Sequence, residues 1–310
     1  MEKIEQFKKN IIPLFHKNRK RMFQTNCFLT FKAITNQYII PMEKRINFIC
    51  NIAILLCLLL PATGGYAQEI DPEFIPKSGQ EGKDVVWVPT PQELVDTMLN
   101  VAKVTSADYL IDLGAGDGRL VITAAKHGAT ALGIEYNPNM VELARRSAKE
   151  EGVSEKAKFE KADIFEYDFS KATVITMFLL PEINLKLRPT ILDMKPGTRI
   201  VSNTFTMNDW EPDKTVNLSS DVNWSTALLW IVPAKVNGTW KFNDGQIKIN
   251  QDFQYISGTI IMGDKEVHLS GKLDGNNISF KAGDREYVGT INGDTMSGAR
   301  VGGGAWSATR

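Results

Sequence analysis

The 310-residue sequence predicts an α/β fold with a largely parallel sheet, followed by a small all-β domain. Residues 85–235 alternate short apolar runs with helical patterns, which is typical of strands and helices that follow one another along the chain. Residues 236–310 hold short runs of alternating hydrophobicity, separated by turn residues at regular intervals. The composition, 43% hydrophobic and 23% charged, is that of a globular protein and excludes a disordered or coiled-coil chain.

Residues 1–67 are interpreted as an N-terminal extension with a signal peptide or membrane anchor. The apolar run Ile46–Leu60 follows basic residues, and small residues up to Ala67 come after it. The run is shorter than the roughly 20 residues of a membrane span, which favours a signal peptide. We expect cleavage after Ala67 and export to the periplasm or the exterior; an uncleaved anchor and a buried core helix are the alternatives. Whether translation starts at Met1 or Met42 stays open.

Charge and cysteine are unevenly distributed along this chain of zero net charge. Residues 1–45 contain ten Lys or Arg and three Glu, which leaves 26 basic and 33 acidic residues in the remainder, a net charge of −7. An acidic body binds nucleic acid poorly. The three cysteines, Cys27, Cys50 and Cys57, all precede the body. The body can therefore form no disulfide, no cysteine nucleophile and no cysteine-ligated metal site, and no metal ligands are assigned in it.

The predicted elements of the α/β segment follow a polar, acidic linker at residues 68–84. Thr90-Pro91-Gln92-Glu93 has the residues of a capping box with Pro at the first helical position, which predicts a helix start. The apolar run Tyr109–Leu113 predicts the first strand, and a glycine turn and a helix that ends near Gly128 follow it. Asn137-Pro138 predicts another helix start. The other predicted elements are strands at Thr130–Glu135, Ala157–Lys161, Val174–Leu179, Arg199–Ser202, Val216–Leu218 and Ala227–Val232, and a helix at Glu182–Met194.

The C-terminal segment, residues 236–310, predicts a meander of short antiparallel strands. Asn243-Asp244-Gly245, Asp274-Gly275-Asn276 and Asn292-Gly293-Asp294 are residues that hairpin turns favour. Their spacing predicts a small barrel or sandwich, and which of the two it is stays open. The predicted strands are Thr239–Phe242, Gln246–Asn250, Tyr255–Met262, Glu266–Leu273, Ile278–Lys281, Tyr287–Ile291, Met296–Val301 and Trp306–Thr309.

The run Asp112-Leu113-Gly114-Ala115-Gly116-Asp117-Gly118 lies between the first predicted strand and its helix. Glycines at alternate positions let the backbone turn sharply and approach a ligand, and the helix start offers unpaired N–H groups. The dinucleotide-binding pattern G-x-G-x-x-G needs a glycine where Arg119 stands. No G-K-[ST] follows, which excludes a phosphate-binding P-loop.

Two carboxylates follow the next two strands in order. Glu135 ends the second strand, 17 residues after Gly118, where an acid can accept hydrogen bonds from both hydroxyls of a ribose. Asp163 and Ile164 follow the third strand, where a carboxylate can bind an adenine amino group and an aliphatic side chain can cover its face. Together with the glycine turn, they predict a nucleoside site without a phosphate clamp.

These motifs resemble the class I S-adenosylmethionine-dependent methyltransferases over about residues 85–235. The matching runs are DLGAGDG at 112–118, GIEYNP at 133–138 and KADIF at 161–165. The resemblance implies a Rossmann-like sheet of seven strands with helices on both faces and an antiparallel last strand. It also implies S-adenosyl-L-methionine as cofactor, bound by Asp112, Gly114, Gly116, Gly118, Glu135, Asp163 and Ile164.

Further runs resemble one subgroup, which includes the mitochondrial ATP synthase c-subunit lysine N-methyltransferases and their bacterial relatives. These are Trp87-Val88-Pro89-Thr90, the run around the glycine turn, and FLLPE at 178–182. The resemblance implies a protein lysine as a possible acceptor, so a protein amine is favoured over a small molecule.

The acceptor side is predicted after the fourth strand. The [DNS]-P-P-[FYW] motif of amino-methyltransferases acting on DNA and on glutamine is absent there, which makes nucleic acid an improbable acceptor. Phe178 and Pro181 are candidate substrate residues. Glu182 is the candidate catalytic residue, because its carboxylate can hold a cationic amine near the methyl group; alternatively it is an acid favoured in a first helical turn.

An export signal conflicts with a cytoplasmic cofactor, so other functions stay open. One is a catalytically inactive, exported nucleoside- or ligand-binding protein with a methyltransferase fold, and another is a different Rossmann-like enzyme. Membrane association through residues 46–60 is a further possibility. The sequence does not identify the acceptor, the methylated atom, the role of the β domain or the oligomeric state.

Overall fold

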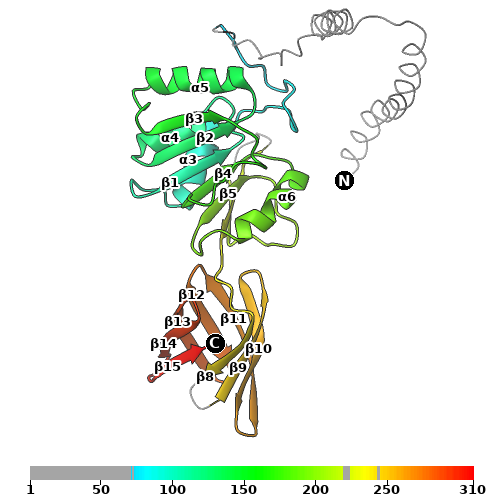
Figure 1. Cartoon of the computed structure of the whole chain (residues 1–310), viewed down its shortest axis with the longest axis vertical. Coiled ribbons are helices and arrows are strands. Elements are labelled where there is room, and N and C mark those ends of the chain that lie inside the picture. The colour runs from blue at the N-terminus through cyan, green and yellow to red at the C-terminus, as the bar shows by residue number, and fades with distance from the viewer. Residues whose placement is uncertain (1–70, 72, 219–223, 243–244) are drawn as a thin grey trace, which may run out of the picture. The chain divides into compact units, whose positions relative to one another are not determined.

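The computed structural model of the chain describes residues 71, 73–218, 224–242 and 245–310 (Figure 1). The predicted signal peptide or anchor, including the cleavage position after Ala67, lies outside these residues. Over the residues that are described, no helix is long and apolar enough to cross a membrane.

A sheet of seven strands forms the first part of the fold. Its strands are β1 (Tyr109–Leu113), β2 (Thr130–Glu135), β3 (Ala157–Lys161), β4 (Val174–Met177), β5 (Arg199–Asn203), β6 (Lys214–Asn217) and β7 (Thr226–Ile231). Their order across the sheet is β3-β2-β1-β4-β5-β7-β6. The first five strands pair in parallel, whereas β7 is antiparallel to both β5 and β6. The predicted α/β fold with its antiparallel end is therefore confirmed.

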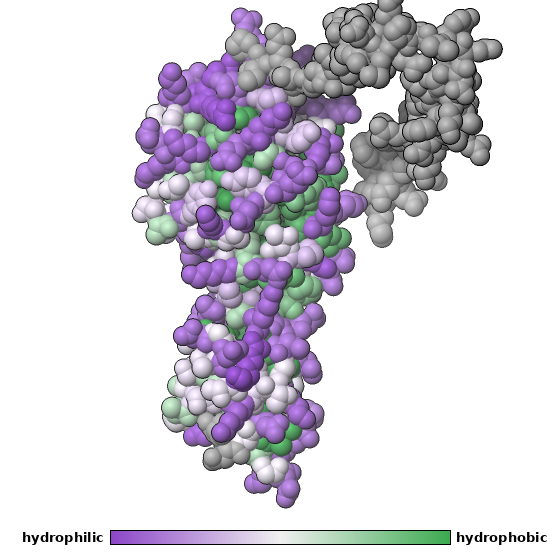
Figure 2. All heavy atoms as spheres, viewed as in Figure 1, coloured by the Kyte–Doolittle hydropathy of each residue, from purple (hydrophilic) through white to green (hydrophobic). Residues whose placement is uncertain are grey.

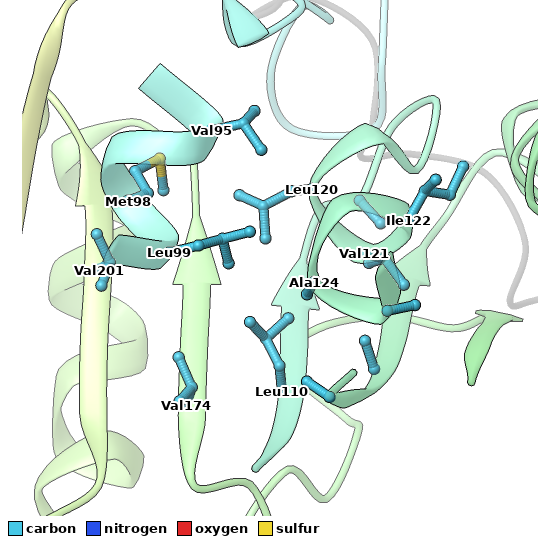
Figure 3. Packing of buried hydrophobic residues seen from close by; sticks show 14 of the residues in the cluster. Val95, Met98, Leu99, Leu110, Leu120, Val121, Ile122, Ala124, Val174 and Val201 are labelled. Carbon is cyan, nitrogen blue, oxygen red and sulfur yellow. The ribbon is translucent and has the colours of Figure 1, made fainter. Parts of the chain in front are cut away.

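Helices cover both faces of this sheet, as the resemblance implies. They are α3 (Gln92–Val101), α4 (Arg119–Lys126), α5 (Pro138–Glu150) and α6 (Pro181–Leu192). Buried residues of α3, α4 and α5 belong to one hydrophobic cluster and those of α6 to another. Neighbouring strand residues alternate between them, with Leu110 in the first and Ile111 in the second, because side chains of a strand point to opposite faces. Figure 3 shows the first cluster, where Leu99 of α3 lies near Leu120 of α4.

Of the two predicted helix caps, one is confirmed and the other is wrong. Asn137 caps α5, since its Oδ1 accepts a hydrogen bond from the Asn139 N–H at 2.9 Å. The capping box predicted to begin at Thr90 does not form, because Pro91 is the N-cap of α3 and no side chain caps this helix. The Thr90 hydroxyl oxygen instead accepts a hydrogen bond from Asn203 Nδ2 at 3.3 Å, in the buried interior. The hydroxyl therefore bonds to β5 and not to the helix N–H groups.

The last part of the chain is a closed antiparallel barrel of eight strands. They are β8 (Gly238–Phe242), β9 (Gly245–Asp252), β10 (Tyr255–Met262), β11 (Lys265–Asp274), β12 (Asn277–Ala282), β13 (Arg285–Asn292), β14 (Thr295–Arg300) and β15 (Ala305–Thr309). Each strand pairs with the next, and β15 pairs back with β8, which decides between the predicted barrel and sandwich. Apolar side chains fill the interior; the largest are Trp240, Phe242, Phe280, Tyr287 and Trp306.

Two tryptophans of the first part of the fold are fully buried, Trp210 and Trp230. The Trp230 indole donates to the Trp210 carbonyl at 2.8 Å, and the Trp210 indole donates to Gln254 Oε1 at 2.9 Å. Each buried N–H therefore has a partner. On the surface, Figure 2 shows hydrophilic side chains over α5 and apolar residues gathered on the side where α6 lies.

Candidate active site

The glycine turn after β1 needs glycine for two physical reasons. Gly114, Gly116 and Gly118 have φ angles of 80°, 56° and 81°, in the left-handed region that side chains disfavour. There is also no room for a Cβ. At Gly116 it would lie 2.5 Å from the Trp87 indole nitrogen, and at Gly118 it would lie 2.7 Å from the Phe159 ring. The predicted turn is thus a tightly packed backbone segment, in which Gly116 and Gly118 are buried and Gly114 is exposed.

Glu135, at the end of β2, is tied directly to this turn. One carboxylate oxygen accepts a hydrogen bond from the Gly116 N–H at 2.9 Å, and the other accepts one from the Asn137 N–H at 2.9 Å. An ionised carboxylate has about four lone-pair sites, so two remain for donors such as ribose hydroxyls. Glu135 therefore holds the turn in place and still has acceptor capacity for a ligand, a double role that its spacing from Gly118 did not reveal.

Asp112 is the buried carboxyl of the site. Only 6% of the residue is exposed, and its Oδ1 accepts a hydrogen bond from Thr176 Oγ1 at 2.7 Å. Burial raises the pKa of Asp112 to about 7; the Thr176 bond opposes this shift, and the negative charges of Glu135 and Asp117 add to it. This carboxyl is thus close to half-protonated at neutral pH, and a cationic ligand would favour its ionised form.

Asp163 lies after β3, where the sequence predicts the adenine end. Its Oδ1 accepts a hydrogen bond from the Phe165 N–H at 2.9 Å, and its other oxygen pairs with Lys83. The hydrogen bond from the Lys83 ammonium, with the Phe165 N–H, lowers the pKa of Asp163. The ammonium also lies 5.0 Å from the centre of the Tyr136 ring. Ile164, the second residue predicted there, is half-buried against the hydrophobic cluster of α6.

Sequence reasoning missed Lys83, which falls in the predicted linker at residues 68–84. Nothing in the local pattern marks it, because its partner Asp163 lies 80 positions further along the chain. The segment that carries Lys83 is itself fixed beside the glycine turn: the Trp87 N–H donates to the Gln80 carbonyl at 2.9 Å. The Thr90 carbonyl accepts from Arg119 Nη1 at 2.8 Å. The chain before α3 therefore forms one wall of the site.

The candidate acceptor residues follow β4. A Cβ at Gly114 would lie 3.1 Å from Leu179 Cδ2, so the end of β4 contacts the glycine turn directly. Phe178 is half-buried beside it, and Pro181 is the first residue of α6. Glu182 is exposed in the first turn of α6, where the helix dipole favours a carboxylate. No hydrogen bond or ion pair within the described residues joins Glu182 to the glycine turn, so its catalytic role stays a prediction.

No group of three or more His, Cys, Asp or Glu that could hold a metal ion occurs among the described residues. The candidate site consists of the glycine turn, three carboxylates and the apolar residues after β4. Its arrangement suits a neutral or cationic nucleoside better than a phosphate-bearing one, because the turn is flanked by Asp112, Glu135 and Asp163.

Comparison with known proteins agrees with this geometry. Residues 112–214 match the model of the ANTKMT methyltransferase domain. The chain is 40% identical over 151 residues to a protein-lysine N-methyltransferase of Saccharolobus islandicus, a match of 48% of this chain and 94% of that protein. It is 31% identical over 140 residues to the human ATP synthase c-subunit lysine N-methyltransferase, covering 45% of this chain and 60% of that protein.

Among solved structures, an RNA methyltransferase from Salinibacter ruber in complex with S-adenosyl-L-homocysteine is 47% identical to the chain. The match covers 48% of this chain and 96% of that one, with a TM-score of 0.46. Each of these three proteins thus aligns with just under half of the chain.

Proposed function

Since the chain belongs to the class I S-adenosylmethionine-dependent methyltransferases, in the group of the ATP synthase c-subunit lysine N-methyltransferases, we propose that it methylates the side-chain amine of a lysine in a protein. The observation that carries this acceptor is the 40% identity to a protein-lysine N-methyltransferase across 94% of that relative's length. Other relatives are covered less completely, about 60% for the human protein.

The residues of the site fit this cofactor. Gly114 of the glycine turn is exposed, Glu135 keeps acceptor sites for ribose hydroxyls, and Asp112 is a buried carboxyl that a cation would ionise. S-adenosylmethionine supplies a methyl group already activated on a sulfonium, so the transfer needs no further electrophilic catalyst. The residues that would hold it are Asp112, Gly114, Gly116, Gly118, Glu135, Asp163 and Ile164.

The protein's own part in the reaction is alignment and control of the acceptor proton. A lysine amine attacks only in its neutral form, so the acceptor side must desolvate the ammonium or let its proton pass to water. Holding donor and acceptor in line supplies roughly 7–11 kcal/mol of the barrier without a dedicated base. In this proposal Phe178 and Pro181 shape the acceptor side, and Glu182 attracts the incoming cation.

Charge supports a basic protein segment over nucleic acid as the acceptor. Residues 46–310 carry a net charge of −7, which attracts lysine-rich surfaces and repels a phosphate backbone. The alternative of an inactive binding protein has no support from the family matches. Export, or anchoring through residues 46–60, is retained as a proposal about location.

The test combines binding with transfer. Calorimetry of the purified chain with S-adenosylhomocysteine should give micromolar affinity that Glu135→Ala weakens about 10- to 150-fold, because one or two charge-assisted hydrogen bonds are lost. Gly152→Ala is a distant control that should leave the affinity unchanged.

Transfer is then followed with S-adenosylmethionine carrying a labelled methyl group and extracts treated with protease or with nuclease. Label that is lost with protease and found on lysine by mass spectrometry supports the proposal. Label on RNA, or binding without any transfer, would overturn it.

A further inference from the structure

Three aromatic side chains gather beside the candidate acceptor residues, and none of them belongs to a hydrophobic cluster of the described residues. We call Phe178, Phe205 and Trp224 the aromatic patch. The Phe178 ring centre lies 6.0 Å from each of the other two, and the Phe205 and Trp224 centres are 5.1 Å apart. Trp224 is 41% exposed and the two phenylalanines are half-buried. The patch thus exposes aromatic surface to solvent, and this surface is not packed into the hydrophobic core.

The sheet places this patch at the same edge as the glycine turn. Phe178 directly follows Met177, which pairs with Leu113 of β1 on one side and Ser202 of β5 on the other. Phe205 and Trp224 come from the loops after β5 and before β7, two strands that pair at this end. In open α/β sheets this carboxyl edge is where ligands bind. The patch is therefore next to the predicted cofactor site, on its β5 side.

The backbone that carries the patch is held in a strained form. Trp224 has φ 69° and Thr204, before Phe205, has φ 61°, although both carry a Cβ. Such residues persist only where the surroundings enforce them, and they are concentrated at functional sites. Here the Phe205 carbonyl accepts hydrogen bonds from Ser202 Oγ at 2.7 Å and from Asn184 Nδ2 at 3.2 Å. The loop is thus fixed so that the ring stays in the patch.

Trp224 also differs from the two other exposed aromatic rings of the described residues, because both of those have a cation nearby. The rings of Tyr136 and Tyr255 each have a lysine ammonium of the same chain within 6 Å of the ring centre. Across the described residues, no Lys or Arg lies over a ring of the patch. Aromatic faces attract ammonium groups, and methylated ammonium most readily because it is easily desolvated. The ammonium group of an acceptor could therefore occupy the position over these rings that no cation of the described residues fills.

We propose that the aromatic patch binds the alkylammonium end of the lysine acceptor, with Phe205 and Trp224 as specificity-determining residues beside Phe178. This inference rests on the proposed lysine methylation and deepens it. The rings pack against the lysine alkyl chain and receive its ammonium by cation–π attraction, which favours an amine-bearing acceptor over a neutral side chain of equal size. Because methylation keeps the charge, the patch also holds mono- and dimethylated lysine for a further transfer.

The test measures binding at Trp224 and not turnover. The full chain labelled with 5-fluorotryptophan, saturated with S-adenosylhomocysteine, is titrated with N-acetyl-trimethyllysine methylamide and with its neutral analogue in which carbon replaces the charged nitrogen. The fluorine signal of Trp224, assigned with Trp224→Phe, should shift with an affinity about 2- to 30-fold higher for the cation. The signal of the barrel residue Trp240 should stay unchanged.

Variants separate the cation effect from general packing. Trp224→Leu and Phe205→Leu should remove most of the preference for the cation. In Phe205→Leu the affinity is again measured on the Trp224 signal. In Trp224→Leu, which has lost that signal, it is measured by competition between the charged and the neutral compound. Trp224→Phe should retain much of it. Tyr255→Leu is a matched control, since Tyr255 is similarly exposed at 43% but lies on the barrel.

Equal affinity for the charged and neutral compounds, or an unchanged preference in Trp224→Leu, would refute the inference. The two proposals also fail separately. Lysine methylation in the transfer assay without a charge preference at Trp224 refutes the patch alone. A charge preference without any lysine methylation refutes the proposed function and leaves the patch as a binder of alkylammonium groups.

Discussion

The buried carboxyl of Asp112 should make the protein less stable as the pH rises towards neutrality. Its pKa is about 7 in the folded chain, against an ordinary value of 3.8. Because the folded pKa is the higher one, the protonated form favours folding. This contribution is fully present below pH 3.8 and is lost as the pH rises through about 7.

The magnitude follows from the two pKa values. Integrating the proton difference between pH 5 and pH 8 gives a loss of about 2–3 kcal/mol in the free energy of unfolding, since each pKa unit is worth about 1.4 kcal/mol. Asp112→Asn stays neutral at every pH and keeps an acceptor oxygen for the Thr176 hydroxyl. We therefore expect the variant to lose this part of the pH dependence and to be more stable than the wild type at pH 8.

The assay is urea unfolding of wild type and variant between pH 5 and pH 8.5. Asp108→Asn is the matched control, because hydrogen bonds from Thr105, Thr173 and Arg199 outweigh desolvation and lower the pKa of Asp108. The stability that Asp108 contributes depends on pH in the opposite direction, because it is lost as the pH falls through that lowered pKa. If the wild type and Asp112→Asn keep a constant difference across this range, the account of Asp112 as a carboxyl protonated near neutrality is wrong.

Two further outcomes are expected. Lys83→Met should tighten binding of S-adenosylhomocysteine about two- to fivefold, as measured by calorimetry. The reason is that the Lys83 ammonium competes with an adenine amino group for Asp163. Weaker binding in the variant would instead show that Lys83 is part of the ligand site. Gly116→Ala should lower the free energy of unfolding by more than Gly152→Ala, which shares a left-handed φ of 71° but has no atom within 4 Å of its Cβ position. The control should cost about 1–2 kcal/mol for the backbone alone, and equal losses in urea unfolding would show that the contact of Gly116 with Trp87 is unimportant.

The fold was largely predictable because its signals are local. Apolar runs and turn residues indicated the strands of the sheet and of the barrel, although the predicted strand Val216–Leu218 overlaps only part of β6 (Lys214–Asn217). Closure of the barrel was not predictable, because it depends on pairing Ala308 with Phe242, a contact between its first and last strands. The capping box predicted at Thr90 is wrong for a similar reason. The side-chain amide of Asn203, which is distant in the sequence, donates a hydrogen bond to the Thr90 hydroxyl that the local pattern assigns to the helix N–H groups.

That the glycine turn and Glu135 lie together could be predicted for the same physical reason. The glycine turn is specified within seven consecutive residues, and Glu135 lies at the end of the neighbouring strand. Lys83 reaches Asp163, and Phe205 and Trp224 reach Phe178, from other segments of the chain, so no local pattern encodes these contacts.

Two consecutive residues after β4 connect the predicted cofactor site with the proposed acceptor site. Phe178 belongs to the aromatic patch, while Leu179 packs toward the glycine turn near Gly114. Neighbouring side chains of an extended segment point to opposite sides, so one peptide unit sets the spacing between the cofactor end and the proposed acceptor end. A change of residue at Phe205 or Trp224 can therefore alter the acceptor surface without moving the turn.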